Sequence, residues 1–221
     1  MPLEVRTGIS LPVLADLELP ESKLEQSLAG FLSEEEKERA ERFAKPLRRR
    51  QHVWSRLLLL ALAKLCFTGQ PARIQEEPPF SPRLFIGDSR YFTSVTHSGT
   101  RVACLVSRNP AAIDIERIDT ARPLDRYAKT AFNTEIAAEI LKEKDFPQAF
   151  YEAWGAYECA VKLGMPREFR WETGSPRIKG FEVTAMREEG WMKVTAVIRG
   201  EKIYSLRMTG EEIARLLRSG K

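Results

Sequence analysis

The stretch RRRQHVWSRLLLLALAKLCFTG, from Arg48 to Gly69, carries the strongest structural signal in this sequence. Its last two-thirds are apolar on nearly every side of a helix, and Gly69 and Pro71 provide a stop. A helix of this kind belongs in the interior of a protein. We therefore predict a long buried helix around which neighbouring elements pack.

Elements on both sides of this helix follow from local patterns. Before it, LSEEEKERAERF begins with a capping box, Ser33 with Glu36 three residues later, which predicts an exposed charged helix. After it, YFTSVT at 91–96 and RVACLVS at 101–107 are rich in β-branched and aromatic residues, which predicts adjacent antiparallel strands. AAIDIE at 111–116 predicts a further strand.

The rest of the chain repeats this order of helices followed by strands. Helical periodicity covers NTEIAAEILKEK at 133–144 and PQAFYEAWGAYECAVKLG at 147–164. Residues 180–208 predict three strands joined at Gly190 and Gly200, and a short amphipathic helix, EEIARLLRS, follows them. The fold class is therefore predicted to be α+β, with two similar halves.

The composition allows such a protein and argues against several classes. With 221 residues, of which 43% are hydrophobic, the chain can bury a core as one domain or as two halves, which the repeated order places at 1–109 and 110–221. The 35 basic and 31 acidic residues give a net charge of +4, which favours an acidic partner but is weak for a nucleic-acid-binding protein. Three scattered cysteines and two histidines, with no CxxC pair, argue against a disulfide framework or a zinc site.

Targeting and membrane signals are not found in the sequence. The segment MPLEVRTGISLPVLADLELP has no basic start followed by an apolar core. The longest apolar run, LLLLALA at 57–63, is too short to span a bilayer. We therefore expect a cytoplasmic protein that does not act at a membrane.

Two carboxylates stand in the predicted strand AAIDIE. Residues two apart on a strand point to the same face, so Asp114 and Glu116 project together while Ile113 and Ile115 face the opposite side. Two adjacent carboxylates repel each other unless a cation lies between them, and a hard cation such as Mg²⁺ is bound by carboxylates, waters and phosphate oxygens. The alternative is a solvated face at the edge of a sheet.

A second set of candidate residues lies on the predicted helix at 147–164. Trp154, Glu158 and Lys162 are four residues apart and form one stripe. Taken alone, a Glu and a Lys at this spacing are an ordinary solvated pair, and a tryptophan is more often a core residue than a ligand contact.

Together, AIDIE and the later W..YE...K resemble the signature of 4′-phosphopantetheinyl transferases, of the monomeric two-lobed type that primes peptide and polyketide synthases. The resemblance covers roughly residues 31–164. It implies two similar α+β lobes related by a pseudo-twofold axis. Each lobe would be a small antiparallel sheet packed with a long helix, with the active site in the cleft between the lobes.

The resemblance implies an activity and a role for each candidate residue. Such an enzyme transfers 4′-phosphopantetheine from coenzyme A to a serine of an apo acyl or peptidyl carrier protein and releases 3′,5′-ADP. The family's metal ligands fall on Asp114, Glu116 and Glu158, which would hold Mg²⁺. Glu158 would also take the serine proton, and Lys162 would neutralise charge on the phosphates.

The same resemblance assigns the binding of coenzyme A and of the carrier. His97 and Ser98 would lie beside the coenzyme A phosphates, Arg56 would hold the 3′-phosphate, and Lys45 and the run from Arg48 to Arg50 would add positive charge. His97 has an alternative as a loop histidine bonded to backbone. The acidic carrier would be steered by basic residues after the DIE strand, Arg122, Arg126 and Lys129.

Three residues depart from the family pattern. Ala112 replaces a glycine, Gly155 replaces a small hydroxyl or thiol residue, and Tyr157 replaces a lysine near the phosphates. A catalytically silent module that binds coenzyme A or a carrier protein is therefore an alternative function. A Mg²⁺-dependent nuclease is less well supported. Those sites commonly place a lysine two residues after an acid on a strand, and the predicted strand AAIDIE has no such lysine. Neither a Walker A loop nor a G-x-G-x-x-G motif occurs.

Overall fold

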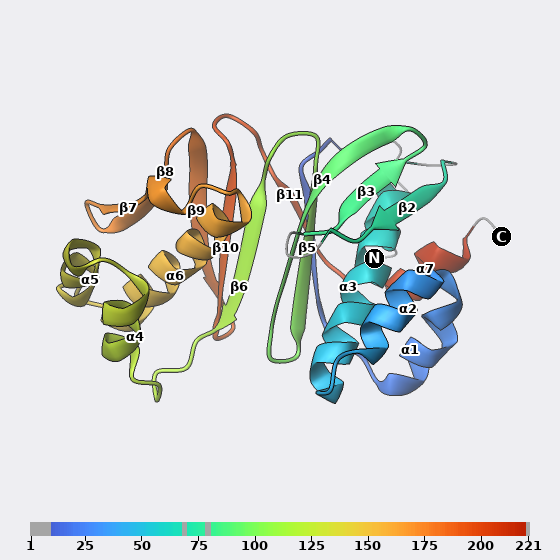
Figure 1. The fold of residues 1–221 in the computed structure, drawn as a ribbon, viewed down its shortest axis with the longest axis horizontal. Helices are drawn as coiled ribbons and strands as arrows, with labels where there is room; N and C mark the ends of the chain where they lie inside the picture. Colours follow the sequence, from blue (N-terminus) through green and yellow to red (C-terminus); the bar gives the residue numbers. More distant parts are fainter. Residues whose placement is uncertain (1–9, 68–69, 78–80, 220–221) are drawn as a thin grey trace. The chain divides into compact units, whose positions relative to one another are not determined.

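The computed structural model describes residues 10–67, 70–77 and 81–219, in two compact units. The first unit comprises Met1–Asn109 together with Lys202–Lys221, and the second unit comprises Pro110–Glu201. Each unit packs a long helix against a sheet, and Figure 1 labels most of the elements of both.

The first unit is built on a six-stranded sheet with the order β11-β1-β5-β4-β3-β2. Neighbouring strands are antiparallel except for β1 and β11, which are parallel. The strands are β1 (Val13–Glu18), β2 (Ala72–Gln75), β3 (Arg83–Ile86), β4 (Ser89–Ser98), β5 (Arg101–Ser107) and β11 (Tyr204–Arg207).

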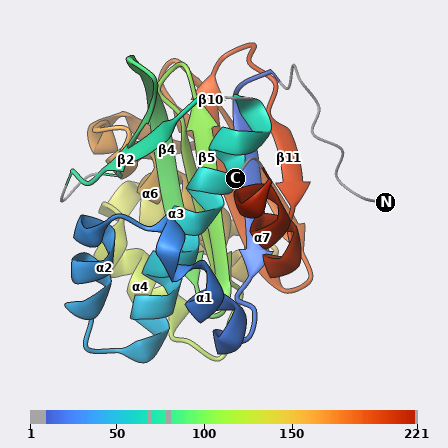
Figure 2. The ribbon, with the colours of Figure 1, turned by 90° about the vertical axis from the view of Figure 1, so that its right-hand side faces the viewer.

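Helix α3 (Pro46–Cys66) is the long buried helix that the sequence predicts. Its residues Trp54, Leu57 and Leu58 are fully buried, and it lies across the sheet with three shorter helices around it (Figure 2). These helices are α1 (Ser22–Leu28), α2 (Glu34–Glu41) and α7 (Gly210–Arg218). The predicted capping box of Ser33 and Glu36 is present at the start of α2.

The second unit has a three-stranded antiparallel sheet with the order β6-β10-β9. Helix α6 (Phe146–Lys162) packs on one face of this sheet (Figure 1). Asp145 caps its N-terminus, and Gly164 follows it with a φ of 75°, which suits a glycine. The other elements are β6 (Ala112–Arg117), β9 (Phe181–Glu188), β10 (Trp191–Ile198), the ribbon of β7 (Phe169–Glu172) and β8 (Ser175–Ile178), α4 (Leu124–Ala131) and α5 (Thr134–Leu141).

The predicted α+β class is confirmed, but the C-terminal residues belong to a different unit from the one predicted from the sequence. Strands β9 and β10 form a hairpin through Gly190, as predicted. Strand β11 does not join this sheet but pairs with β1 in the sheet of the first unit. Helix α7 contributes Ile213 and Leu217 to the core around α3. Residues 202–219 therefore belong to the first unit, whereas the sequence placed 110–221 in one lobe. In the part of the chain described, none of the helices has the length and apolarity needed to cross a membrane.

Candidate functional site

An ion pair between Asp114 and Lys162 joins β6 to α6 at the centre of the candidate site. Lys162 Nζ lies 2.8 Å from Asp114 Oδ1 and 2.8 Å from the carbonyl oxygen of Ile113, to which it donates. Strand alternation turns Asp114 towards α6, and Lys162 occupies the last turn of that helix. Asp114 is only 5% exposed, so its carboxylate is shielded from water, while Lys162 keeps partial contact with it.

The surroundings of Lys162 favour its charged form. Burial alone lowers the pKa of Lys162, but the charge of Asp114 and its hydrogen bond outweigh burial and raise the pKa above the ordinary value of 10.5. Lys162 is therefore a fixed cation at neutral pH. It is suited to neutralise an anionic group brought next to Asp114.

Glu158 is half-buried one turn before Lys162 and is electrostatically coupled to Asp114. Burial is the largest cause that raises the pKa of Glu158, the charge of Asp114 raises it further, and Lys162 opposes both. The two carboxylates therefore repel each other, which is the condition that a divalent cation would relieve.

Glu116 lies on the same face of β6 as Asp114. The register with β10 sets Glu116 opposite Met192 and Asp114 opposite Val194, and both of these partners belong to the core under α6. Among the described residues, no group of three or more His, Cys, Asp or Glu side chains is gathered closely enough to hold a metal ion. Asp114 and Glu158 are thus brought together. Glu116 shares the strand face of Asp114 but does not complete a cluster of three carboxylates.

Glu116 lines a pocket of about 560 Å³, named here the aromatic pocket. Arg122 provides a second polar group in its lining, which is otherwise mainly apolar. Five aromatic or phenolic rings line it, from Tyr127, Phe150, Tyr151, Trp154 and Tyr157. Except for Trp154 and Tyr157, these ring residues were not anticipated from the sequence. The recurrence of rings at 150, 154 and 157 on one helix is the signal that would have indicated them.

Gly155, one of the departures from the family pattern, is explained by close packing. A Cβ at this position would lie 2.6 Å from Val194 Cγ2 and 3.7 Å from Asp114 Oδ2. Glycine therefore lets α6 approach β10 closely, right beside the Asp114 carboxylate.

We predict that Gly155→Ala lowers the free energy of unfolding by about 1–2 kcal/mol, because overpacking against Val194 outweighs the better helix propensity of alanine. Urea denaturation measures this change. In a Val194→Ala background, which removes the Cγ2 contact at 2.6 Å but keeps the Cβ at 3.0 Å, the same substitution should cost less. An equal loss in both backgrounds would contradict the packing explanation.

Tyr157, another departure, belongs to an aromatic cluster. Its ring centroid lies 5.8 Å from that of Phe132, 5.8 Å from that of Phe169 and 6.5 Å from that of Trp154. The position at which the resemblance expects a lysine is thus occupied by a ring that packs against Phe132, between α4 and α5, and Phe169 on β7, and that lines the aromatic pocket. Lys162, the other lysine of the pattern, is present and pairs with Asp114.

The first unit brings together several of the predicted phosphate-binding residues. Arg48 Nη1 lies 2.8 Å from His97 Nδ1, and it also contacts His97 Nε2. Gln51, one turn further along α3, donates to the carbonyl oxygen of Gly99 at 2.8 Å, which fixes the start of α3 against the β4–β5 turn. Ser98 follows His97 at the end of β4, and Lys45 is the N-cap residue of α3.

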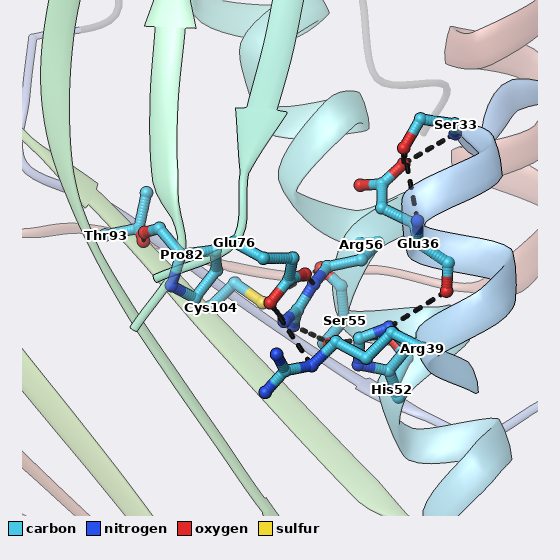
Figure 3. A network of polar contacts seen from close by, with 10 residues as sticks. All are labelled: Ser33, Glu36, Arg39, His52, Ser55, Arg56, Glu76, Pro82, Thr93 and Cys104. Atoms are coloured by element: carbon cyan, nitrogen blue, oxygen red, sulfur yellow. Dashed lines mark hydrogen bonds and ion pairs between the residues drawn. The ribbon is translucent and has the colours of Figure 1, made fainter. Parts of the chain in front are cut away.

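Arg56 has a different environment from the one expected. Its guanidinium is buried and holds Glu76 through Nε–Oε1 at 2.6 Å and Nη2–Oε2 at 2.8 Å (Figure 3). Arg39 adds a further contact to Glu76 at 3.4 Å. Burial raises the pKa of Glu76, but the hydrogen bond and charge of Arg56 outweigh it, so the pKa is lowered. A phosphate would have to displace Glu76 to reach Arg56.

Comparisons with known proteins identify no family for this chain. No protein-family model matches it, and no curated protein is significantly similar to it. The function must therefore be inferred from the chemistry of the residues just described.

Proposed function

We propose that this protein transfers 4′-phosphopantetheine from coenzyme A to a serine of an acidic apo carrier protein and releases 3′,5′-ADP. The observation that carries the proposal is the meeting of Asp114, Glu158 and Lys162, from segments far apart in the sequence, in one partly buried charged site. We also infer, from the resemblance, that the two units are similar lobes of a cytoplasmic monomer.

Two carboxylates, Asp114 and Glu158, offer oxygen ligands of the kind that Mg²⁺ takes. Carboxylate oxygens are the ligands this ion prefers. Burial, and after it the charge of Asp114, raises the pKa of Glu158, and a bound cation would remove the repulsion from Asp114. Asp114 and Glu158 would hold the ion, and Glu116, on the same strand face as Asp114, would have to move closer to them to become a third ligand. When bound, Mg²⁺ would neutralise charge on the diphosphate of coenzyme A.

The protein's own residues then have complementary roles in the transfer. The serine oxygen attacks the phosphorus that bears the pantetheine arm, and the bond from this phosphorus to the bridging oxygen of the 3′,5′-ADP group breaks. Glu158, half-buried one turn before Lys162, accepts the serine proton. Lys162, held in its charged form by Asp114, balances the negative charge of the phosphates.

Two further features support this function. The aromatic pocket, with Glu116 in its lining, has the size and apolar character that suit the pantetheine arm. In the first unit, Arg48 and His97, with Lys45 and Ser98 near them in the chain, are proposed to bind the phosphates of coenzyme A. The role expected for Arg56 requires the displacement of Glu76 and remains a prediction.

Intact-mass analysis of an apo carrier protein tests the proposal. After incubation with this protein, coenzyme A and Mg²⁺, the carrier should gain one phosphopantetheine arm. The gain should be lost with EDTA and in the Asp114→Ala and Glu158→Ala variants, and reduced in Arg48→Ala. The exposed Glu135→Ala on α5 is the matched control and should retain activity.

The alternative is a silent module that binds coenzyme A or a carrier protein, which the ring of Tyr157 in place of a lysine favours. If no carrier type gains mass while coenzyme A still binds in calorimetry, this alternative replaces the transferase.

Carrier recruitment should depend on salt if it is electrostatic. Arg126 and Lys129 are exposed on α4, and Arg122 lies nearby with Asp119 3.3 Å from its Nε. We predict that the KM for the carrier rises with ionic strength and with Arg126→Glu, whereas the KM for coenzyme A changes less with Arg126→Glu. A carrier KM that is the same at low and high salt would rule out steering by these residues.

A further inference from the structure

A second pocket, of about 700 Å³, lies in the second unit along the β7–β8 ribbon, the start of strand β9 and Arg199, which follows β10. It shares no lining residue with the aromatic pocket. We name it the ribbon pocket. Its lining contains four cations, Arg170, Arg177, Lys179 and Arg199, and three carboxylates, Glu168, Glu172 and Glu182.

Two of the cations are direct cross-strand neighbours. The register of the ribbon sets Arg170 on β7 opposite Arg177 on β8, so both side chains leave the same face. Like charges directly opposite each other destabilise a strand pair, and an anion between them removes the repulsion. Lys179, in the turn just after β8, lines the same pocket and adds a third positive charge near this pair.

The arginine on β7 is held in place. Arg170 Nη1 donates to the carbonyl oxygens of Arg167 and Phe169, both at 2.7 Å. Such anchoring lowers the cost of immobilising the guanidinium on binding an anion. In the part of the chain that the structure describes, none of the four cations forms an ion pair.

We propose that the ribbon pocket binds a nucleoside diphosphate or triphosphate. The paired guanidiniums and Lys179 match a short run of phosphates, since arginine binds phosphate oxygens with two parallel hydrogen bonds. The carboxylates accept hydrogen bonds only, and they suit the hydroxyl groups of a sugar. The half-buried Phe181 in the lining offers an apolar surface to a base.

The three carboxylates favour a small ligand over a nucleic acid. A continuous phosphate backbone would pass Glu168, Glu172 and Glu182 and be repelled by them, whereas a nucleotide places its phosphates at one end. The volume of the pocket also falls in the range of small-molecule sites. This inference uses none of the residues assigned to the transferase reaction, so it stands or fails independently of that proposal.

Titration calorimetry with ADP, pyrophosphate and adenosine, in buffer with EDTA and low salt, tests the site. ADP should bind one to one, pyrophosphate more weakly, and adenosine without measurable heat. Arg177→Glu and Lys179→Glu should each weaken ADP binding by about tenfold or more, because each removes charge-assisted hydrogen bonds. Lys144→Glu, an exposed lysine outside the pocket with the same change of charge, is the matched control and should bind like the wild type.

Three results would overturn the proposal. These are the absence of ADP binding, an equal loss in Lys144→Glu and Lys179→Glu, or a loss in Arg48→Ala with none in Lys179→Glu. The last result would place ADP at the phosphate-binding residues of the first unit. Amide NMR shifts on adding ADP give a check that needs no variant, because they should centre on Lys179 and Arg199.

Discussion

Replacing Lys162 with methionine is expected to lower the free energy of unfolding by about 3–5 kcal/mol, one of the largest effects in this protein. Methionine keeps most of the length of the side chain but removes the cation next to Asp114, whose side chain is only 7% exposed. It also removes the donor to the carbonyl oxygen of Ile113. A carboxylate that stays charged in this position, without Lys162, is costly. Urea denaturation at neutral pH measures the loss.

The double variant Asp114→Asn, Lys162→Met separates the cost of an isolated charge from the value of the pair. It should recover most of the stability, because a neutral pair of similar shape replaces a buried ion pair at little cost. A loss of less than about 1 kcal/mol in the single variant would mean that the pair behaves as an exposed one. Because the folded-state pKa of Lys162 is raised, its contribution should be complete below pH 10.5 and fade as pH rises through the raised value.

Replacing Glu158 with glutamine should have opposite effects on activity and stability. If Glu158 is the base, the rate of transfer should fall by about 10²–10⁴-fold. The metal-free protein should become more stable at neutral pH. A carboxyl whose folded-state pKa is raised stabilises the fold below its ordinary pKa of 4.5 and loses this contribution as pH rises through the raised value. Initial rates and melting temperatures in EDTA measure the two effects.

Mg²⁺ and pH provide the controls for this prediction. Mg²⁺ should raise the melting temperature of the wild type more than that of Glu158→Gln, and Glu135→Gln on α5 should match the wild type. In EDTA, the difference in melting temperature between the wild type and Glu158→Gln should shrink as pH falls below the ordinary glutamate pKa of 4.5, because Glu158 is then protonated. Unchanged transfer by Glu158→Gln would remove the base assignment, and a lower melting temperature in EDTA would contradict the repulsion between Glu158 and Asp114.

The spacing of residues predicted the faces of β6 and α6 but not the partners across them. Asp114 and Glu116 share a face, and Trp154 and Tyr157 line one pocket, as periods of two and 3.6 residues allow. The same periods suggest Glu158 as the partner of Lys162 through their four-residue separation. In the structure Lys162 forms its ion pair with Asp114 instead, because the approach of α6 to β6 depends on tertiary packing around Gly155.

Other features were hidden because their partners are distant or their local patterns are weak. Glu76 lies 20 positions after Arg56, at the start of a proline-rich passage that gives no hint of a buried ion pair. Strand β8 is short and contains Pro176, and proline in a strand-like segment argues against a strand unless it lies at an edge. Strand β11 was expected, but its pairing with β1 joins positions nearly the whole chain apart.

That last pairing sets an order for folding during synthesis on the ribosome. The sheet of the first unit gains its parallel strand β11, and the core around α3 gains Ile213, Leu216 and Leu217, only after all of residues 110–201 have been made. Until then β1 offers an unprotected strand edge, a feature that promotes association with other chains. The second unit, continuous in sequence, has no such delay and is free to fold first.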